Sequence, residues 1–300
     1  MATVGWLQQP SLVWLGTLHG GKESFASGVS ADGSVVVGGA CNAAGQTRAF
    51  RWTYATGMED LGTLGGDWSG AYGVSADGSV VVGVAENADR RERAFRWTRA
   101  TGMGDLGTLG GDWSGAYGVS ADGSVVVGAA YNAAGQQRAF RWTFSMGMED
   151  LGTPPDSDGG WAAGVSADGS VVVGAVEIAA GQLRTFRWTR ATGVEVLDLL
   201  ADPCGEVYGV SADGSVVVGT ACISSSIIAA SVPRAFRWTR AMGMEDLTLT
   251  YAHLLTDGSV LEEVRAISPS GRYIVGYGRN ATTWRKEAFL LDTGVLQLGM

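Results

Sequence analysis

Residues 73–83 read Gly-Val-Ser-Ala-Asp-Gly-Ser-Val-Val-Val-Gly, and this stretch decides the fold because the chain repeats it. The same stretch begins again at Gly28, Gly118, Gly164 and Gly209, and a degenerate copy, Ala-Ile-Ser-Pro-Ser-Gly-Arg-Tyr-Ile-Val-Gly, begins at Ala266. The five identical copies start 45, 45, 46 and 45 positions apart. A period of this length indicates a repeat architecture in which every unit is one supersecondary element. The chain therefore contains six units of about 45 residues.

Each unit is predicted to form four antiparallel strands. In the second unit, Asp77-Gly78 suits a tight hairpin turn, and the apolar, β-branched run 80–82 suits a strand buried on both faces. The segments Arg-Ala-Phe-Arg-Trp-Thr from Arg93 and Met-Gly-Asp-Leu-Gly-Thr-Leu from Met103 predict two further strands. Four-stranded units of this length, repeated four to eight times, are typical of a β-propeller. The sequence thus predicts an all-β fold, a six-bladed β-propeller, in preference to a parallel β-helix, whose period is much shorter.

The strand count leaves one strand over. Residues 12–18 and 294–298 both resemble the outer strand of a blade, whereas ring closure needs only one of them. We expect strand 12–18 to complete the last blade and so to join the two ends of a single domain, 1–300. The expected blades are residues 19–64, 65–109, 110–153, 154–200, 201–249 and 250–299. The surplus strand could instead pair with a neighbouring molecule by β-augmentation.

The composition excludes several classes of protein. With 46% hydrophobic and 17% charged residues the chain is not a disordered segment, and with 6 Pro it is not a collagen. The formal net charge of −9 disfavours nucleic-acid binding, because phosphate neutralisation supplies most of that affinity. We expect no membrane-spanning helix, since the apolar runs are short, and no secretion signal is recognisable at the N-terminus.

Taken together, the segments Arg-Ala-Phe-Arg-Trp-Thr, Gly-Met-Glu-Asp-Leu-Gly-Thr-Leu-Gly-Gly and Gly-Val-Ser-Ala-Asp-Gly-Ser-Val-Val-Val-Gly resemble the HAF-repeat family of extracellular bacterial proteins. The resemblance covers essentially the whole chain. It implies a secreted or surface-attached repeat protein without established catalytic residues. The histidine of the family motif is replaced here by Arg48, Arg93, Arg138 and Arg234, so that no metal or proton role carries over.

The Gly-Gly-Asp-Trp-Ser-Gly segments between units supply the candidate binding residues. These are Asp67, Trp68, Asp112 and Trp113, together with Trp161 at a similar place in the fourth unit. In a propeller such links converge on one face around the channel mouth. A tryptophan ring beside a carboxylate is a common way to hold a sugar or an aromatic group. The alternative interpretation is that these rings only pack between adjacent blades.

Two other patterns have structural interpretations. If the four-residue link 54–57 sets the register, Arg51 lies opposite Asp60, and the pairing recurs in other units as a cross-strand ion pair. By the same arithmetic Arg187 lies opposite Val196. The repeated turn aspartates are explained by the turn itself and lack a metal-binding pattern around them, so we expect neither a metal nor another cofactor.

Cysteine and histidine usage adds little chemistry. Cys204 and Cys222 would face each other across the fifth hairpin, either as a disulfide or as two small buried residues. Only His19 and His253 could serve as a catalytic base, which disfavours a Ser–His hydrolase. No catalytic residue is assigned.

We therefore expect a non-enzymatic extracellular or cell-surface module that binds a glycan or another protein through loops on one propeller face. One alternative is a self-assembling structural protein that uses the surplus strand. Another is a propeller glycan hydrolase or lyase, which would need paired carboxylates or a histidine cluster near the channel mouth.

Overall fold

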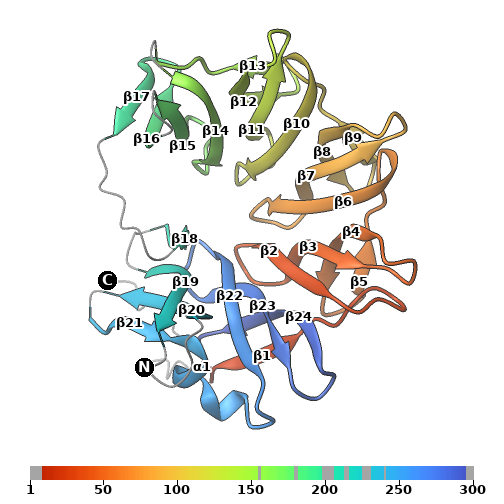
Figure 1. Cartoon of the computed structure of the whole chain (residues 1–300), viewed down its shortest axis with the longest axis vertical. Coiled ribbons are helices and arrows are strands. Elements are labelled where there is room, and N and C mark those ends of the chain that lie inside the picture. The colour runs from red at the N-terminus through yellow and green to blue at the C-terminus, as the bar shows by residue number, and fades with distance from the viewer. Residues whose placement is uncertain are drawn as a thin grey trace, which may run out of the picture.

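The computed structural model describes residues 9–154, 157–178, 182–197, 206–212, 216–224, 231–239 and 241–294. Six four-stranded antiparallel sheets form the blades of a ring, which confirms the predicted six-bladed β-propeller (Figure 1). Each blade presents its first strand to the central channel and its last strand to the rim. Among the described residues, no helix has the length and apolar character needed to cross a membrane.

The strands follow the repeat. Blade 1 contains β2 (Ser24–Val29), β3 (Val35–Cys41), β4 (Thr47–Thr53) and β5 (Gly57–Asp60). Blade 2 contains β6 (Gly65–Val74), β7 (Val80–Asn87), β8 (Glu92–Thr98) and β9 (Gly102–Asp105). Blade 3 contains β10 (Gly110–Val119), β11 (Val125–Asn132), β12 (Gln137–Thr143) and β13 (Gly147–Asp150). Blade 4 contains β14 (Ser157–Val165), β15 (Val171–Ile178), β16 (Gln182–Thr189) and β17 (Gly193–Leu197). Blade 5 contains β18 (Glu206–Val210), β19 (Val216–Ser224), β20 (Ser231–Thr239) and β21 (Gly243–Asp246). Blade 6 contains β22 (Val260–Ile267), β23 (Tyr273–Asn280), β24 (Arg285–Asp292) and β1 (Ser11–Trp14), and α1 (Leu247–Thr250) and the short 3-10 helix η1 (Ala252–Leu254) precede it.

The repeated Ser-Ala-Asp-Gly-Ser turn is held by hydrogen bonds among its own residues. In blade 2 the amide of Gly78 donates to the Ser75 carbonyl at 2.9 Å, and Gly78 adopts a φ of 71°, which favours glycine. The Asp77 carboxylate accepts from the Ser75 hydroxyl at 2.6 Å and from the Ser79 amide at 3.0 Å. The serine, aspartate and glycine of the motif therefore close the hairpin between the first two strands of a blade, whereas the Ala76 amide donates to the Ala121 carbonyl of blade 3 at 3.0 Å.

The register between the third and fourth strands corrects the sequence prediction by one residue. Thr53 pairs with Gly57, so the turn comprises the three residues 54–56, and Gly57 adopts the left-handed conformation with a φ of 67°. Arg51 consequently lies opposite Glu59, and the predicted pairing of Arg51 with Asp60 is wrong. Elsewhere Arg96 lies opposite Gly104, Arg141 opposite Glu149, Arg187 opposite Glu195 rather than Val196, and Arg237 opposite Glu245.

The hydrophobic core lies in the seams between blades. Phe95 is fully buried and Trp97 is 9% exposed, and both pack against Val35, Val37 and Leu61 of the preceding blade. The residues at the position of Phe95 in blades 1, 3 and 4 are also fully buried, namely Phe50, Phe140 and Phe186. In blades 1 to 4 the phenylalanine and tryptophan on one face of the third strand thus pack a blade against its neighbour, as residues that alternate along a strand allow.

A buried serine bridges successive blades through its hydroxyl. Ser69 of blade 2 accepts from the Ala49 amide of blade 1 at 2.8 Å and donates to the Gly62 carbonyl at 2.6 Å. Ser114 makes the equivalent bonds with Ala94 and Gly107 at 2.9 and 2.6 Å. In each case the alanine amide belongs to a buried residue, and the serine hydroxyl gives this amide its hydrogen-bond partner.

The N-terminal strand closes the ring, as predicted. β1 pairs antiparallel with β24, and Figure 1 shows the red strand β1 beside the blue strand β24. Ser24 of blade 1 repeats the serine bridge here, because it accepts from Ala288 at 2.9 Å and donates to the Gly16 carbonyl at 2.6 Å. Of the alternative strand 294–298, only Gly294 lies within the described residues, so pairing with a neighbouring molecule stays a prediction.

The seam between blades 4 and 5 is packed less closely than the others, as far as the described residues show. Val173 of β15 is 43% exposed, whereas Val37, Val82 and Val127 at the same repeat position are fully buried. Figure 1 shows a wide separation between these two blades. An apolar surface that five of the blades bury is therefore partly open to solvent on blade 4.

Candidate functional site

The predicted Asp-Trp segments belong to inner strands. Asp67 and Trp68 lie in β6 where the register shifts between the pairs Gly65–Asn87 and Ser69–Ala85, and β10 places Asp112 and Trp113 in the same way. The shift frees these residues from the regular ladder, as a β-bulge does. Both aspartates are exposed and both tryptophans are half-buried.

Each of these tryptophans is followed four positions later on the same strand by a tyrosine, and a glycine lies midway between the two. A Cβ placed on Gly115 would lie 3.3 Å from the Trp113 ring and 3.2 Å from the Tyr117 hydroxyl oxygen. The corresponding distances from Gly70 are 3.4 Å to the Trp68 ring and 3.6 Å to the Tyr72 hydroxyl oxygen. The glycines therefore leave the space over which the two rings of each pair converge.

One of the two tyrosines, Tyr72, reaches the central channel. Tyr72 lines a cavity of about 200 Å³ together with inner-strand residues of other blades, among them Val29, Val119 and Val165. Tyr72 and Tyr117 meet edge to face, with ring centroids 5.9 Å apart. We call the group Trp68, Tyr72, Trp113, Tyr117 and Glu92 the aromatic mouth.

Within the aromatic mouth, Glu92 connects blade 2 to blade 3. Its carboxylate accepts a 2.7 Å hydrogen bond from Nε1 of Trp113, whose ring lies 5.4 Å from that of Tyr131. Burial, and then the neighbouring Tyr72 and Glu92, raise the pKa of Tyr117 to about 12. The Tyr117 hydroxyl therefore stays protonated and can donate a hydrogen bond over the whole physiological pH range.

Two of the predicted residues, Asp67 and Trp161, have surroundings that differ from those of Asp112 and Trp113. Asp67 accepts from Gln46 at 3.0 Å and forms an ion pair with Arg90 at 3.0 Å, so its carboxylate is already engaged. Trp161 pairs with Ala175 and is half-buried, but it takes the strand position that Gly70 and Gly115 occupy in blades 2 and 3. Trp161 is thus not equivalent to Trp68 and Trp113, and blade 4 lacks the aromatic pair. The ligand-binding role of all five predicted residues stays a prediction.

The predicted disulfide cannot be placed. Cys204 lies outside the described residues, and the side chain of Cys222 in β19 is likewise not described. Cys41 is a free, half-buried cysteine. Among the described residues, no three His, Cys, Asp or Glu side chains group together as metal ligands would.

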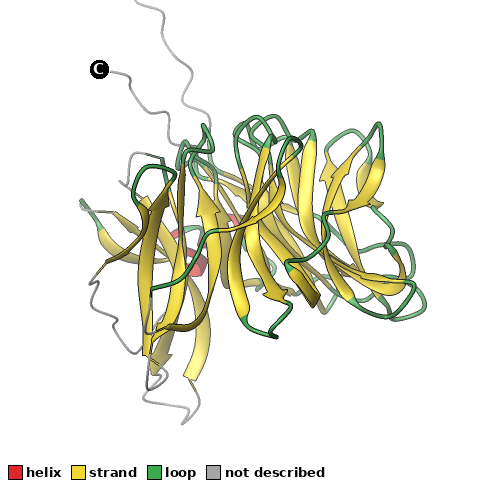
Figure 2. Ribbon diagram, turned by 90° about the horizontal axis from the view of Figure 1, so that it is seen from above, coloured by secondary structure: helices red, strands yellow, loops and turns green. Residues whose placement is uncertain are grey.

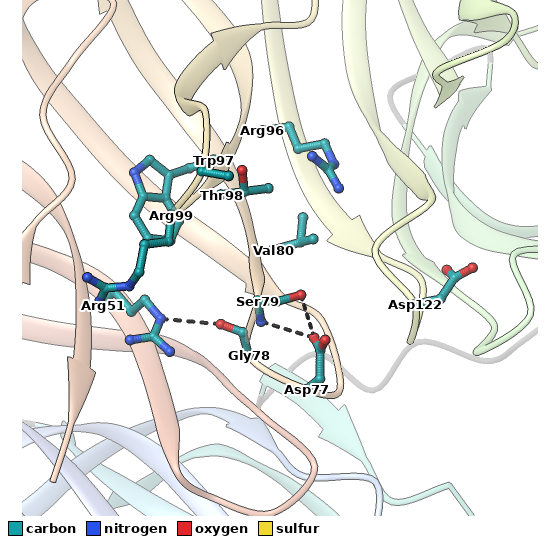
Figure 3. A pocket seen from close by; sticks show the side chains of 11 residues that line it. Arg51, Asp77, Gly78, Ser79, Val80, Arg96, Trp97, Thr98, Arg99 and Asp122 are labelled. Carbon is teal, nitrogen blue, oxygen red and sulfur yellow. Dashed lines mark hydrogen bonds between the residues drawn. The ribbon is translucent and has the colours of Figure 1, made fainter. Parts of the chain in front are cut away.

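A second depression lies at the opposite end of the strands, beside the hairpin turn of Asp77. Figure 2 shows the strands running between two faces of the molecule that carry the loops. On blade 2 this cavity has a volume of about 500 Å³. Figure 3 shows Arg51 and Arg99 on one side of it, Arg96 and Asp122 on the other, and the turn of Asp77 below. The cavity spans the end of one blade and reaches both of its neighbours.

Sequence reasoning missed Tyr72, Tyr117 and Glu92. A signal for the tyrosines was present, because each directly precedes the glycine that opens the repeated motif, an inner-strand position facing the channel. Tyr208 and Arg265 occupy that position in blades 5 and 6, and the Arg265 guanidinium lies 4.9 Å from the Tyr208 ring. Glu92 had no such signal, since its proximity to Trp113 arises from the contact between two blades.

Comparisons with known proteins support the fold. No protein-family model matches the chain and no curated protein is similar to it in sequence, so the HAF-repeat resemblance stays a prediction. A protein from Agrobacterium tumefaciens assigned as TolB is 14% identical with a TM-score of 0.50, over 90% of this chain and 89% of that one. TolB from Acinetobacter baumannii is 12% identical with a TM-score of 0.48, over 90% of this chain and 53% of that one, so this chain spans about half its length. The β-propeller domain of the Trilobed protease from Pyrococcus furiosus is 10% identical with a TM-score of 0.46, over 93% and 100% of the two chains.

Proposed function

We propose that this protein is a non-catalytic binding module that acts outside the cell or at its surface and holds a glycan at the aromatic mouth. The observation that carries this proposal is the convergence of Trp113 and Tyr117 beside the carboxylate of Glu92 at the end of the channel. The similarity to solved β-propellers supports a propeller module and leaves its ligand open.

The chemistry of the aromatic mouth suits a sugar. The faces of half-buried tryptophan rings can pack against the apolar C–H face of a sugar ring, and rigid aromatic side chains lose little entropy when they do so. Asp112 is exposed next to Trp113, and the Tyr117 hydroxyl is a permanent donor. A sugar hydroxyl would therefore find both an acceptor and a donor beside the ring on which it stacks.

The same residues favour recognition over hydrolysis. A glycosidase needs two carboxyl groups that flank the scissile bond and are free to exchange protons. Here Glu92 orients Trp113, and Asp67 is held by Gln46 and Arg90. We therefore assign these carboxylates to positioning and binding.

A glycan array probed with the wild type and with Trp113→Ala and Tyr117→Ala tests the proposal. Truncating a packed aromatic anchor costs about 2 kcal/mol or more, so each variant should bind its glycan at least about tenfold more weakly. Tyr54→Ala is the control, because Tyr54 is 65% exposed in a turn on the opposite face. Glycan binding that survives both substitutions at the aromatic mouth would contradict the proposal, and capture of a protein in place of any glycan would favour the alternative ligand class.

A further inference from the structure

In the parts of the chain that the structure describes, Arg96 lacks an ion pair that the equivalent arginines of four other blades form. In blades 1, 3, 4 and 5 the arginine of the third strand forms an ion pair with the glutamate opposite it. These pairs are Arg51–Glu59 at 3.8 Å, Arg141–Glu149 at 3.6 Å, Arg187–Glu195 at 3.4 Å and Arg237–Glu245 at 2.8 Å. In blade 2 the residue opposite Arg96 is Gly104, and no ion pair with Arg96 occurs among the described residues.

Arg96 is nevertheless held in place. Its Nε donates to the Gly123 carbonyl of blade 3 at 3.2 Å, and its guanidinium carbon lies 4.8 Å from the centre of the Phe144 ring. Burial lowers the pKa of Arg96, and no neighbouring carboxylate offsets this effect. A half-buried charge without a counter-ion is unfavourable, so an anion that reached Arg96 would be bound by a side chain already oriented to receive it.

The cavity beside Arg96 offers partners for hydroxyl groups. Thr98, Ser79 and Asp77 line it, and its volume is about 500 Å³. Oδ1 of Asp77 accepts from Ser75 and Ser79, whereas Oδ2 has no hydrogen bond within the described part of the chain. Oδ2 of Asp77 is therefore available to a ligand hydroxyl.

We propose that this cavity binds a small hydroxylated carboxylate, such as a sugar acid. Its carboxylate pairs with Arg96 and its hydroxyls bond to Asp77 and Ser79. The ligand thus supplies the negative charge that a glutamate supplies in four other blades. A monoanion fits better than a phosphate dianion, because Arg51 and Arg99 of the lining are both paired with Glu59, and the carboxylates of Asp77 and Asp122 would repel the second charge. The site lies on the face opposite the aromatic mouth and does not depend on it.

Blade 4 provides an internal control for this site. Its equivalent cavity of about 560 Å³ is lined by Asp168, Ser170 and Thr189, as well as by Arg187. There, however, Arg187 is paired with Glu195 at 3.4 Å. The same cavity shape with a satisfied arginine should bind the carboxylate much more weakly.

The test is calorimetric titration of the full chain with D-glucuronate, with D-glucose and inorganic phosphate as comparison probes. Gly104→Glu supplies the missing carboxylate, and the space at Gly104 is open, since an added Cβ meets only the Arg96 carbonyl oxygen at 3.6 Å. Glutamate already stands at this position in four other blades, so the variant should keep its fold and its melting temperature. Glucuronate affinity should fall at least about tenfold, because charge-assisted hydrogen bonds are lost. Glu195→Gly should raise the number of bound glucuronates by one.

Three results would overturn the proposal. The first is that the wild-type protein does not bind glucuronate. The second is that Gly104→Glu leaves the affinity for glucuronate unchanged. The third is that glucose or phosphate binds as tightly as glucuronate does. Trp113→Ala separates this site from the aromatic mouth, since it should leave glucuronate binding intact even if it abolishes glycan binding. Loss of glucuronate binding in a folded Trp113→Ala variant would move the ligand to the other face and refute the assignment.

Discussion

Removal of one buried hydroxyl, by Ser69→Ala, should destabilise the propeller measurably. The side chain of Ser69 is fully buried, and its hydroxyl bridges the Ala49 amide at 2.8 Å and the Gly62 carbonyl at 2.6 Å. Alanine fills nearly the same space but leaves both backbone groups without this partner. A buried unsatisfied group costs about 1–3 kcal/mol, and water can partly reach Gly62, so we expect a loss of about 2–4 kcal/mol.

Urea unfolding followed by tryptophan fluorescence and by circular dichroism measures this loss. With a slope of about 3 kcal/mol per molar, a loss of 3 kcal/mol lowers the midpoint by about 1 M. Ser114→Ala should cost the same, because Ser114 makes the same two bonds, and the double variant should be additive. Ser79→Ala, which removes an exposed turn hydroxyl, is the control. A loss below about 0.5 kcal/mol for both bridging serines would refute the claim that these bonds hold the blades together.

Three further outcomes are expected. Gly83→Ala would place a Cβ 2.1 Å from a carbonyl oxygen of β6, so it should abolish folding or lower the melting temperature sharply. Gly104→Ala should be nearly neutral. Thermal unfolding of the two variants checks this, and equal melting temperatures would contradict it. Hydrogen bonds from the Ser120 hydroxyl and then the Ser124 amide lower the pKa of Asp122 from 3.8 to about 2. The ionised carboxylate therefore stabilises the fold fully above about pH 4, and this stabilisation is lost as the pH falls towards 2. Asp122→Asn should make the melting temperature less dependent on pH in that range, and an unchanged pH dependence would argue against this role. Val127→Asp should unfold the protein, because Val127 is fully buried. Val173→Asp should change the free energy of unfolding by less than about 1 kcal/mol, because Val173 is 43% exposed. Similar losses of stability in urea unfolding would show that blades 4 and 5 are closely packed.

The repeat made most of the architecture predictable. Six copies of one motif, five of them with an Asp-Gly hairpin and the sixth with Ser270-Gly271, specify the blade and the number of blades, because local turn chemistry and period-2 patterning are properties of short segments. Ring closure by the N-terminal strand was also expected, since the strand count offered two outer strands, 12–18 and 294–298, for one place in the last blade, and the structure pairs β1 with β24.

The register of the outer strand was not predictable from a link length alone. Gly57 lies in the left-handed region, with a φ of 67°, and belongs to the strand pair, so the turn is one residue shorter than the sequence suggests. That single residue places Glu59 opposite Arg51 and leaves Arg96 facing a glycine. The arginine site on blade 2 becomes visible only after this correction.

The sequence by itself determined the strands, the turns, the blade count and the closure, because each of these depends on residues close together in the chain or on simple counting. Only the tertiary structure decided that Glu92 reaches Trp113, that Ser69 reaches Ala49, and that the tyrosines of two blades meet in the channel. These contacts join residues of different blades, and their geometry depends on how one twisted sheet packs against the next, which no single repeat encodes.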